Sequence, residues 1–177
     1  IQILKDKNFS LKYILALFNS KLLNFVYMKR TKEVGRTFAQ VKTVVLKQLP
    51  IVPAAQEQQQ AFAFKVEQMT NFNKEFNEHN STFIRLLQSK WSNLNITGKI
   101  SEWYRLSFED FRKELEKQKI KLSLPEQVEW LEYFNQQKQE AMTIMSLIEK
   151  TDNEIDRMVY ALYELTDDEI NIVDPMG

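Results

Sequence analysis

Residues 131–162 read LEYFNQQKQEAMTIMSLIEKTDNEIDRMVYAL, and the spacing of the apolar side chains in this stretch decides the fold. Positions that alternate three and four residues apart share one face of a helix, and eight of the ten such positions here are apolar. These ten are Leu131, Phe134, Lys138, Ala141, Met145, Ile148, Asp152, Ile155, Val159 and Leu162. Ser123, Pro125 and Glu126 supply an N-cap, a first-turn proline and a capping-box glutamate. We therefore predict one long helix from 126 to 163.

A second stretch upstream has the same spacing and predicts a helix from about Ala55 to about Ser89. Its seam consists of Phe62, Val66, Met69, Asn73, Phe76, Asn80, Phe83 and Leu87. The two asparagines are typical of polar residues that fix the register of a coiled coil. Two such helices of similar length most simply fold back on each other as an antiparallel hairpin resembling a coiled coil. The alternative is that one of them pairs with a second chain, which would give a homodimer.

Shorter elements surround the two long helices. Residues 92–122 interrupt the pattern, with a turn near Gly98 and a short helix that the N-cap Ser107 opens. Thr166 and Glu169 form another capping box, which opens a short terminal helix.

At the N-terminal end, Ser10 is the predicted cap of a helix from Leu11 to about Tyr27. Gly35 ends this region, and the β-branched residues between Val41 and Val52 predict one or two short strands. The predicted fold class is therefore mainly α, a long helical hairpin with a small α+β part at the N-terminal end.

The composition fits this fold and excludes several classes of protein. The 177 residues are 44% hydrophobic and include three glycines, four prolines and no cysteine, which excludes disulfides, cysteine zinc sites and thiol catalysis. No apolar run reaches the length of a membrane span and no signal peptide is visible, so we expect a cytoplasmic protein with no membrane partner. Because Ile1 is not an initiator residue, we expect the N-terminus to be a cut end.

The zero net charge hides a strong asymmetry. Residues 1–47 carry ten Lys and Arg against two acids, and the remaining residues carry fourteen against twenty-two. Such a split predicts a basic end that meets a polyanion, although a solvated basic helix explains it equally well.

No catalytic constellation accompanies the basic end. The chain has no Pro-Pro pair and no glycine-rich cofactor loop, and it contains neither Glu-X-Lys nor Asp-X-Lys, the half-motifs of many DNA nucleases. His79 is the only histidine, and we expect it to be a surface or packing residue. We predict no catalytic residue, no metal ligand and no cofactor within this chain.

Binding chemistry is present between residues 29 and 47. Six cations occur there with Glu33 as the only counter-charge, namely Lys29, Arg30, Lys32, Arg36, Lys42 and Lys47. Cations in this density neutralise phosphates and give an affinity that falls with salt. Arg36, Thr37 and Gln40 also carry the groups that read base edges in duplex DNA.

Three blocks of the sequence carry a family resemblance. Asn19-Ser-Lys-Leu-Leu-Asn-Phe25, Gly35-Arg-Thr-Phe-Ala-Gln-Val-Lys42 and Leu46-Lys-Gln-Leu-Pro-Ile51 resemble the TaqI-like C-terminal specificity domain. That domain follows the catalytic domain in N6-adenine methyltransferases of restriction-modification systems, including fused type IIG restriction enzymes. The stretch from Lys150 to Ile170 looks like the closing helix of the same proteins.

The resemblance implies a bacterial parent protein whose upstream domain binds S-adenosylmethionine and methylates adenine, with or without a nuclease. This chain would supply DNA recognition in residues 1–53, a helical spacer in 54–165 with an insertion at about 92–122, and a terminal helix and tail in 166–177. Its partners would be duplex DNA and the upstream methyltransferase domain. The expected DNA-binding residues are Lys29, Arg30, Lys32, Arg36, Thr37, Gln40 and Lys42.

Two functions remain open from the sequence. A DNA-recognition and spacer module predicts that the cations of residues 1–47 gather on one face. A coiled-coil scaffold, which dimerises or docks a protein without contacting nucleic acid, predicts cations paired with acids and an exposed apolar stripe on one long helix.

Overall fold

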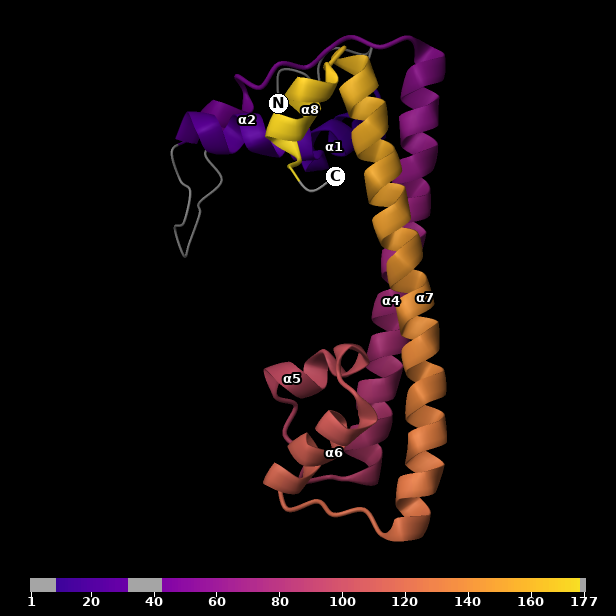
Figure 1. Cartoon of the computed structure of the whole chain (residues 1–177). Coiled ribbons are helices and arrows are strands. Elements are labelled where there is room, and N and C mark those ends of the chain that lie inside the picture. The colour runs from indigo at the N-terminus through magenta and orange to yellow at the C-terminus, as the bar shows by residue number, and fades with distance from the viewer. Residues whose placement is uncertain (1–8, 32–42, 176–177) are drawn as a thin grey trace. The chain divides into compact units, whose positions relative to one another are not determined.

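The computed structural model describes residues 9–31 and 43–175. It is 78% helical, and no strand occurs in the ranges that it describes, so the prediction of a mainly α fold is confirmed. Figure 1 shows the helices along the chain. They are α1 (Leu11–Asn19), α2 (Lys21–Thr31), α3 (Thr43–Leu46), α4 (Gln56–Lys90), α5 (Gly98–Ser101), the 3₁₀-helix η2 (Trp103–Arg105), α6 (Phe108–Lys117), α7 (Leu124–Leu162) and α8 (Asp167–Val173).

The chain forms two compact units. Unit 1 comprises residues 1–70 and 149–177, and unit 2 comprises residues 71–148. The two long helices α4 and α7 contribute to both units, and they pack against each other as the hairpin prediction requires. Each unit has its own hydrophobic core.

The core of unit 1 joins both ends of the chain. Tyr13 of α1 meets Phe62 of α4 edge-to-face, with ring centroids 5.3 Å apart. Leu17, Leu23, Val66, Ile155, Val159 and Tyr160 are buried in the same cluster. On the surface of this unit, Lys65 Nζ of α4 lies 2.6 Å from Glu154 Oε2 of α7.

The core of unit 2 is aromatic. The Trp103 ring stacks on Phe83 with centroids 3.7 Å apart, and Phe111 stacks on Phe134 at 4.9 Å. All four side chains are fully buried. Leu87, Ile100, Leu115 and Ala141 are buried in the same cluster, so α5, η2 and α6 are held on the paired long helices by apolar burial.

The predicted helix starts are confirmed where the signal is a local cap. The Ser107 hydroxyl accepts a hydrogen bond from Asp110 N at the start of α6. Thr166 and Glu169 form the complete capping box of α8. Ser123 N and Oγ both donate to Glu126 Oε2 beside the start of α7.

The prediction of one helix over residues 11–27 is wrong. The backbone of Ser20 is extended, with φ −66° and ψ 150°, and divides the region into α1 and α2. The reason is a cap from a distant residue, because Asp156 Oδ1 of α7 accepts a hydrogen bond from Lys21 N at 2.9 Å. Ser20 Oγ also accepts from Leu23 N at 3.3 Å.

The predicted strands between Val41 and Val52 are also wrong within residues 43–52. Residues 43–46 form the single-turn helix α3, and the chain then runs on without regular structure to α4. The carbonyls of Pro50 and Val52 accept hydrogen bonds from tyrosine hydroxyls instead of strand N–H groups. The α+β description of this region is therefore not correct for the described residues.

One position of the predicted helical seam is wrong, and two of its polar positions make contacts that the spacing does not predict. Leu131 is 43% exposed, and its neighbour Trp130 packs inward against Trp91, with ring centroids 5.0 Å apart. Lys138 donates through Nζ to the Leu106 carbonyl at 2.7 Å. Asn80, expected to fix the register, accepts a hydrogen bond from Trp103 Nε1 at 2.8 Å.

Candidate nucleic-acid interface

Lys29 and Arg30 lie in the last turn of α2, where cations complement the unsatisfied carbonyls of the helix end. Both side chains are exposed. Lys29 Nζ stands 5.2 Å from the centroid of the Phe25 ring, and Arg30 Nη1 donates to the Gln48 carbonyl at 2.6 Å. The last turn of α2 is therefore joined to the segment that follows α3.

Lys47 adds a third exposed cation at this place. It follows α3, which packs against α2, and it precedes the Gln48 carbonyl that binds Arg30. Within residues 9–31 and 43–175, no carboxylate pairs with Lys29, Arg30 or Lys47. The described carboxylates therefore leave the charge of these three side chains unneutralised.

Two other cations of the basic region are engaged within unit 1. Lys12 forms an ion pair with Glu67 of α4. Lys21 Nζ lies 2.6 Å from Asp174 Oδ2 and 3.8 Å from Asp156 Oδ2, and the Asp174 contact raises the pKa of Lys21. Part of the charge asymmetry read from the sequence is therefore neutralised within unit 1, and the three other described cations of residues 1–47 lie at the C-terminal end of α2 and just after α3.

Asp156 holds the opposite end of α2. Its side chain is buried, and this burial raises the pKa of its carboxyl group even though Lys21 N donates to it. Among the described residues, Asp156 Oδ2 has no hydrogen-bond partner, and neither has the buried hydroxyl of Tyr160 one turn along α7. The start of α2 is therefore fixed to α7 by one backbone hydrogen bond and by the ion pair of Lys21 with Asp156.

Two tyrosine hydroxyls bind the backbone of residues 50–52, which follow the basic region. Tyr13 OH donates to the Val52 carbonyl at 2.6 Å, and Tyr163 OH donates to the Pro50 carbonyl at 2.5 Å. Burial, followed by the charge of Tyr163, raises the pKa of Tyr13 to about 12. Both phenols stay protonated as donors at neutral pH, so this segment remains attached to α1 and α7.

The structure places only part of the predicted DNA-binding set. Lys29 and Arg30 are exposed and close to Lys47 on neighbouring elements. Lys32, Arg36, Thr37, Gln40 and Lys42 lie outside the described residues. The sequence reasoning missed the supporting contacts of Asp156, Tyr13 and Tyr163, because their partners are distant in the chain and leave no periodic signal.

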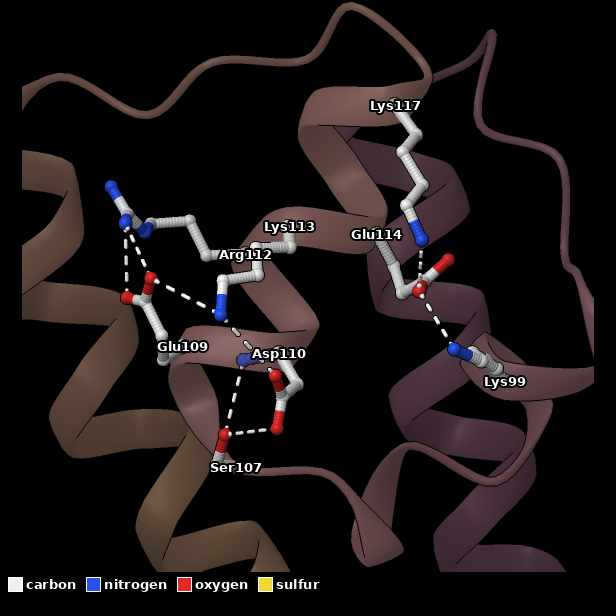
Figure 2. Close-up of polar contacts among 8 residues, drawn as sticks. All are labelled: Lys99, Ser107, Glu109, Asp110, Arg112, Lys113, Glu114 and Lys117. Atoms are coloured by element: carbon white, nitrogen blue, oxygen red, sulfur yellow. Dashed lines mark hydrogen bonds and ion pairs between the residues drawn. The ribbon is translucent and has the colours of Figure 1, made fainter.

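The cations of α6 in unit 2 differ from those at the end of α2. Figure 2 shows that they meet carboxylates of the same helix or its neighbourhood. Arg112 Nη2 lies 2.9 Å from Glu109 Oε1, and Lys113 Nζ lies 3.6 Å from Asp110 Oδ1. Glu114 receives both Lys117 at 2.7 Å and Lys99 at 3.5 Å. These ion pairs stabilise α6. Because they neutralise its cations, little positive potential remains there to attract a polyanion.

His79 follows the expectation of a packing residue. Its Nε2 lies 3.0 Å from the Gln137 carbonyl of α7, and its Nδ1 lies 3.8 Å from Glu140 Oε2. Among the described residues, no group of three or more His, Cys, Asp or Glu side chains could hold a metal ion. None of the helices in the same ranges is long and apolar enough to cross a membrane.

Comparison with known families divides the chain in two. A family model described as a domain of unknown function (DUF8810) matches residues 55–159. A second model, described as the TaqI-like C-terminal specificity domain, matches residues 1–51. No curated protein and no solved structure matches the chain.

Proposed function

The chain belongs to the family described as a domain of unknown function (DUF8810), and we propose that it is the DNA-recognition and spacer module of a restriction-modification adenine methyltransferase. The observation that carries this proposal is the match of residues 1–51 to a TaqI-like C-terminal specificity domain. The exposed cations Lys29, Arg30 and Lys47 support it, because they lie within that matched region and pair with no carboxylate of the described chain.

In this proposal, duplex DNA binds at the C-terminal end of α2. Lys29, Arg30, Lys32 and Lys42 neutralise backbone phosphates, which fixes position without reading sequence. Arg36, Thr37 and Gln40 reach base edges, where an arginine suits guanine and a glutamine suits adenine. The contacts of Asp156, Tyr13 and Tyr163 hold the surrounding elements in place.

The remaining residues act as a spacer. Residues 1–53 contain the recognition part, 54–165 the spacer hairpin and 166–177 the terminal helix and tail. Catalysis belongs to an upstream domain of the parent protein, which binds S-adenosylmethionine and methylates adenine, with or without an attached nuclease. The parent acts in the bacterial cytoplasm.

A coiled-coil scaffold is the second candidate. The exposed apolar residues Leu124, Val128 and Leu131 on α7 favour it. The predicted seam residues do not, since Phe62, Val66, Phe83 and Leu87 are buried within the units. A homodimer would therefore need a surface other than the heptad seam.

The test is duplex binding by the 177-residue chain, followed by fluorescence anisotropy at low and near-physiological salt. We expect affinity to fall steeply with salt, with a slope of about 0.9 for each phosphate contact on a logarithmic plot. Lys29→Gln with Lys47→Gln tests the described cations, and Arg36→Ala with Lys42→Ala tests the proposed reading segment. Both pairs should weaken binding and reduce the salt slope.

The matched control is Lys119→Gln with Lys121→Gln, which removes the same charge from exposed lysines of unit 2. This control should bind like the wild type. No binding at low salt, or equal loss in all three double variants, would contradict the proposal and favour the scaffold. A sequence-selected duplex that binds more tightly than a random one, and loses this preference in the Arg36 and Lys42 variant, would establish recognition.

A further inference from the structure

Residues 160–177 lie outside both family matches, which cover residues 1–51 and 55–159. This C-terminal part nevertheless contacts the matched specificity region at two separate points within unit 1. Tyr163 OH donates to the Pro50 carbonyl at 2.5 Å, and Asp174 Oδ2 lies 2.6 Å from Lys21 Nζ. In the sequence, Lys21 and Pro50 stand on either side of residues 29–47, which carry the cations and the proposed base-reading side chains.

The ion pair of Lys21 with Asp174 runs against the preference of both helices. Lys21 is the first residue of α2, where the partial positive charge of a helix start disfavours a cation. Asp174 directly follows the last residue of α8, where the partial negative charge of a helix end disfavours an anion. Because neither charge stabilises its own helix, the contribution of the pair is to attach α8 to α2, two helices that also pack against each other (Figure 1).

The turn between α7 and α8 fixes the position of both contacts. Leu165 N donates to the Tyr160 carbonyl at 3.0 Å and Glu164 N donates to the Ala161 carbonyl at 3.2 Å, which are the two hydrogen bonds of a Schellman motif. Glu164 has φ 55°, a left-handed conformation that is unfavourable for a residue with a Cβ atom. Such a conformation persists where the surrounding structure holds it, and Leu165 packs here on the core of unit 1. Tyr163 and α8 therefore leave this turn in one direction.

Tyr163 is one of three side chains that bind alternate carbonyls of residues 48–52. Arg30 Nη1 donates to the carbonyl of Gln48 and Tyr13 OH donates to that of Val52, both at 2.6 Å. Within the described part of the chain, no backbone–backbone hydrogen bond involves residues 50–53. Side chains of α1, α2 and the end of α7 therefore set the position of the segment that follows α3.

We propose that Tyr163 and Asp174 are positioning residues for DNA recognition, which hold the two flanks of residues 29–47 without touching DNA. Tyr163 fixes the segment that follows α3, and Asp174 fixes the start of α2 through Lys21. Base contacts need side chains held within about 0.5 Å of the productive geometry. Phosphate contacts carry no sequence information and depend chiefly on charge. The inference rests on the proposed function, and it gives the C-terminal part of the chain a role in that function.

Both contacts can be removed without disturbing a core. The Lys21 side chain is 37% exposed, and ion pairs of exposed side chains stabilise proteins only weakly. Tyr163→Phe retains the ring that packs on the core of unit 1 and removes only the hydroxyl group. The variants should therefore stay folded, which circular dichroism and urea unfolding verify. Unfolded molecules would lower the active fraction for all duplexes alike, whereas misplaced side chains change the ratio between duplexes.

The test uses the 177-residue chain, a duplex selected by the wild type from a random library, and a random duplex of equal length. Fluorescence anisotropy at several salt concentrations gives both affinities and the salt slope. In Tyr163→Phe with Asp174→Ala, the preference for the selected duplex should fall about fivefold or more, because base contacts are misplaced. Affinity for the random duplex and the salt slope should stay at the wild-type values, because the phosphate contacts remain.

Three further variants separate positioning from other effects. Lys29→Gln with Lys47→Gln should lower the salt slope instead, because it removes proposed phosphate contacts. Asp174→Glu keeps a carboxylate for Lys21 and should retain most of the preference that Asp174→Ala loses. The matched control is Tyr133→Phe with Glu149→Ala, which removes one hydroxyl group in unit 2 and one exposed carboxylate of α7. This control should keep the wild-type preference and slope.

Each contrary result has a distinct meaning. A preference that survives in Tyr163→Phe with Asp174→Ala, or that falls equally in the control, overturns the positioning role and leaves the proposed function intact. A lower salt slope in the same double variant also overturns it, because the two residues would then govern phosphate contacts. A wild-type chain that selects no duplex contradicts the proposed function itself, and the positioning role falls with it.

Discussion

At the scale of single residues, buried polar groups fix positions that apolar packing alone would leave adjustable. Asn80 lies in the seam of α4 and accepts a hydrogen bond from Trp103 Nε1. This hydrogen bond joins the insertion of residues 92–122 to α4. Asp156 caps α2 from a distant helix in the same way. In both cases one side chain joins segments that are far apart in the sequence, and its loss leaves a buried group without a partner.

Replacing Asn80 by Ala should therefore destabilise unit 2. The buried indole N–H of Trp103 would lose its acceptor, which costs about 1–3 kcal/mol in the free energy of unfolding. Urea unfolding followed by tryptophan fluorescence measures this loss. Asn135→Ala, at an exposed position of α7, should change stability by less than about 0.5 kcal/mol. Equal stability of Asn80→Ala and the wild type would contradict the assigned role.

Asp156 should give stability a distinctive pH dependence. Burial raises the pKa of this carboxyl group in the folded state, although Lys21 opposes the effect and Asp152 and Asp174 add to it. Because the folded pKa lies above the unfolded one, the stabilising contribution is complete below about pH 4 and is lost as the pH rises through the folded pKa.

Asp156→Asn removes this ionisation and retains a side-chain oxygen for Lys21 N. Compared with the wild type, the variant should therefore gain in relative stability as the pH rises from about 4 towards neutrality. Urea unfolding at a series of pH values provides the comparison, and the other carboxyl groups cancel because both proteins contain them. Parallel pH profiles would show that Asp156 does not titrate differently in the two states.

At the scale of elements, short helices here depend on their caps. Helix α8 has seven residues and starts with a complete capping box, in which Thr166 Oγ1 accepts from Glu169 N and Glu169 accepts from Thr166 N. Helices of this length are unstable alone in water. The cap and the packing of Ile170 and Val173 on the unit 1 core therefore keep α8 folded, and α8 in turn places Asp174 beside Lys21.

Thr166→Ala should open α8 without unfolding the rest of unit 1. The lost cap costs about 1 kcal/mol, which should raise the hydrogen-exchange rates of the α8 amides several-fold. Exchange measured by NMR or mass spectrometry for residues 167–173 tests this. Thr166→Asn keeps a capping oxygen and should restore protection, while Thr143→Ala on the exposed face of α7 should leave it unchanged. Unchanged exchange in Thr166→Ala would show that packing alone holds the helix.

At the scale of the whole molecule, the two units differ in how the chain builds them. Unit 2 is one continuous segment, residues 71–148, with its own aromatic core. Unit 1 is discontinuous, because residues 9–31 and 43–70 share a core with Ile155, Val159 and Tyr160 from the far end of the chain. A continuous segment with its own core is able to fold by itself.

We therefore predict that residues 71–148 expressed alone fold cooperatively. The fragment should show a sigmoidal urea transition, and Phe111→Ala should destabilise it by about 3–5 kcal/mol because Phe111 is fully buried. Circular dichroism and tryptophan fluorescence should report the same midpoint. Residues 1–70 alone should lack such a transition and regain it only on addition of 149–177. Non-coincident or gradual transitions of the 71–148 fragment would contradict this division.

Sequence patterns predict the elements whose signals are local. The caps Ser107 and Thr166 mark helix starts correctly, and the apolar spacing predicts the two long helices within a few residues. The break at Ser20 was not predictable in this way, because the decisive cap comes from Asp156, 135 residues away from Lys21. The strand prediction is wrong for a similar reason. The hydroxyls of Tyr13 and Tyr163 donate hydrogen bonds to the carbonyls of Val52 and Pro50, and both tyrosines are distant in the sequence.

The candidate sites show the same limit. Charge density led to the prediction that Lys29 and Arg30 bind DNA, but it could not show that Lys12 and Lys21 form ion pairs with carboxylates of unit 1. The seam pattern placed Leu131 in the core because periodicity does not say which of two apolar rows is covered. Trp130 takes the inward position through its contact with Trp91, and Leu131 is left at the surface.

The discontinuity of unit 1 also sets an order of events on the ribosome. Residues 9–31 and 43–70 are made before unit 2, but Ile155 and Val159, which complete their core, follow only after unit 2. At roughly 5–20 residues per second, this leaves the early segment waiting for about 5–20 s. Unit 2 emerges complete in the meantime, so we expect it to fold first while α1 keeps its apolar face uncovered. Nascent chains stalled before residue 150 should therefore bind chaperones through the part of unit 1 that precedes residue 71, and release them once residues 149–173 emerge.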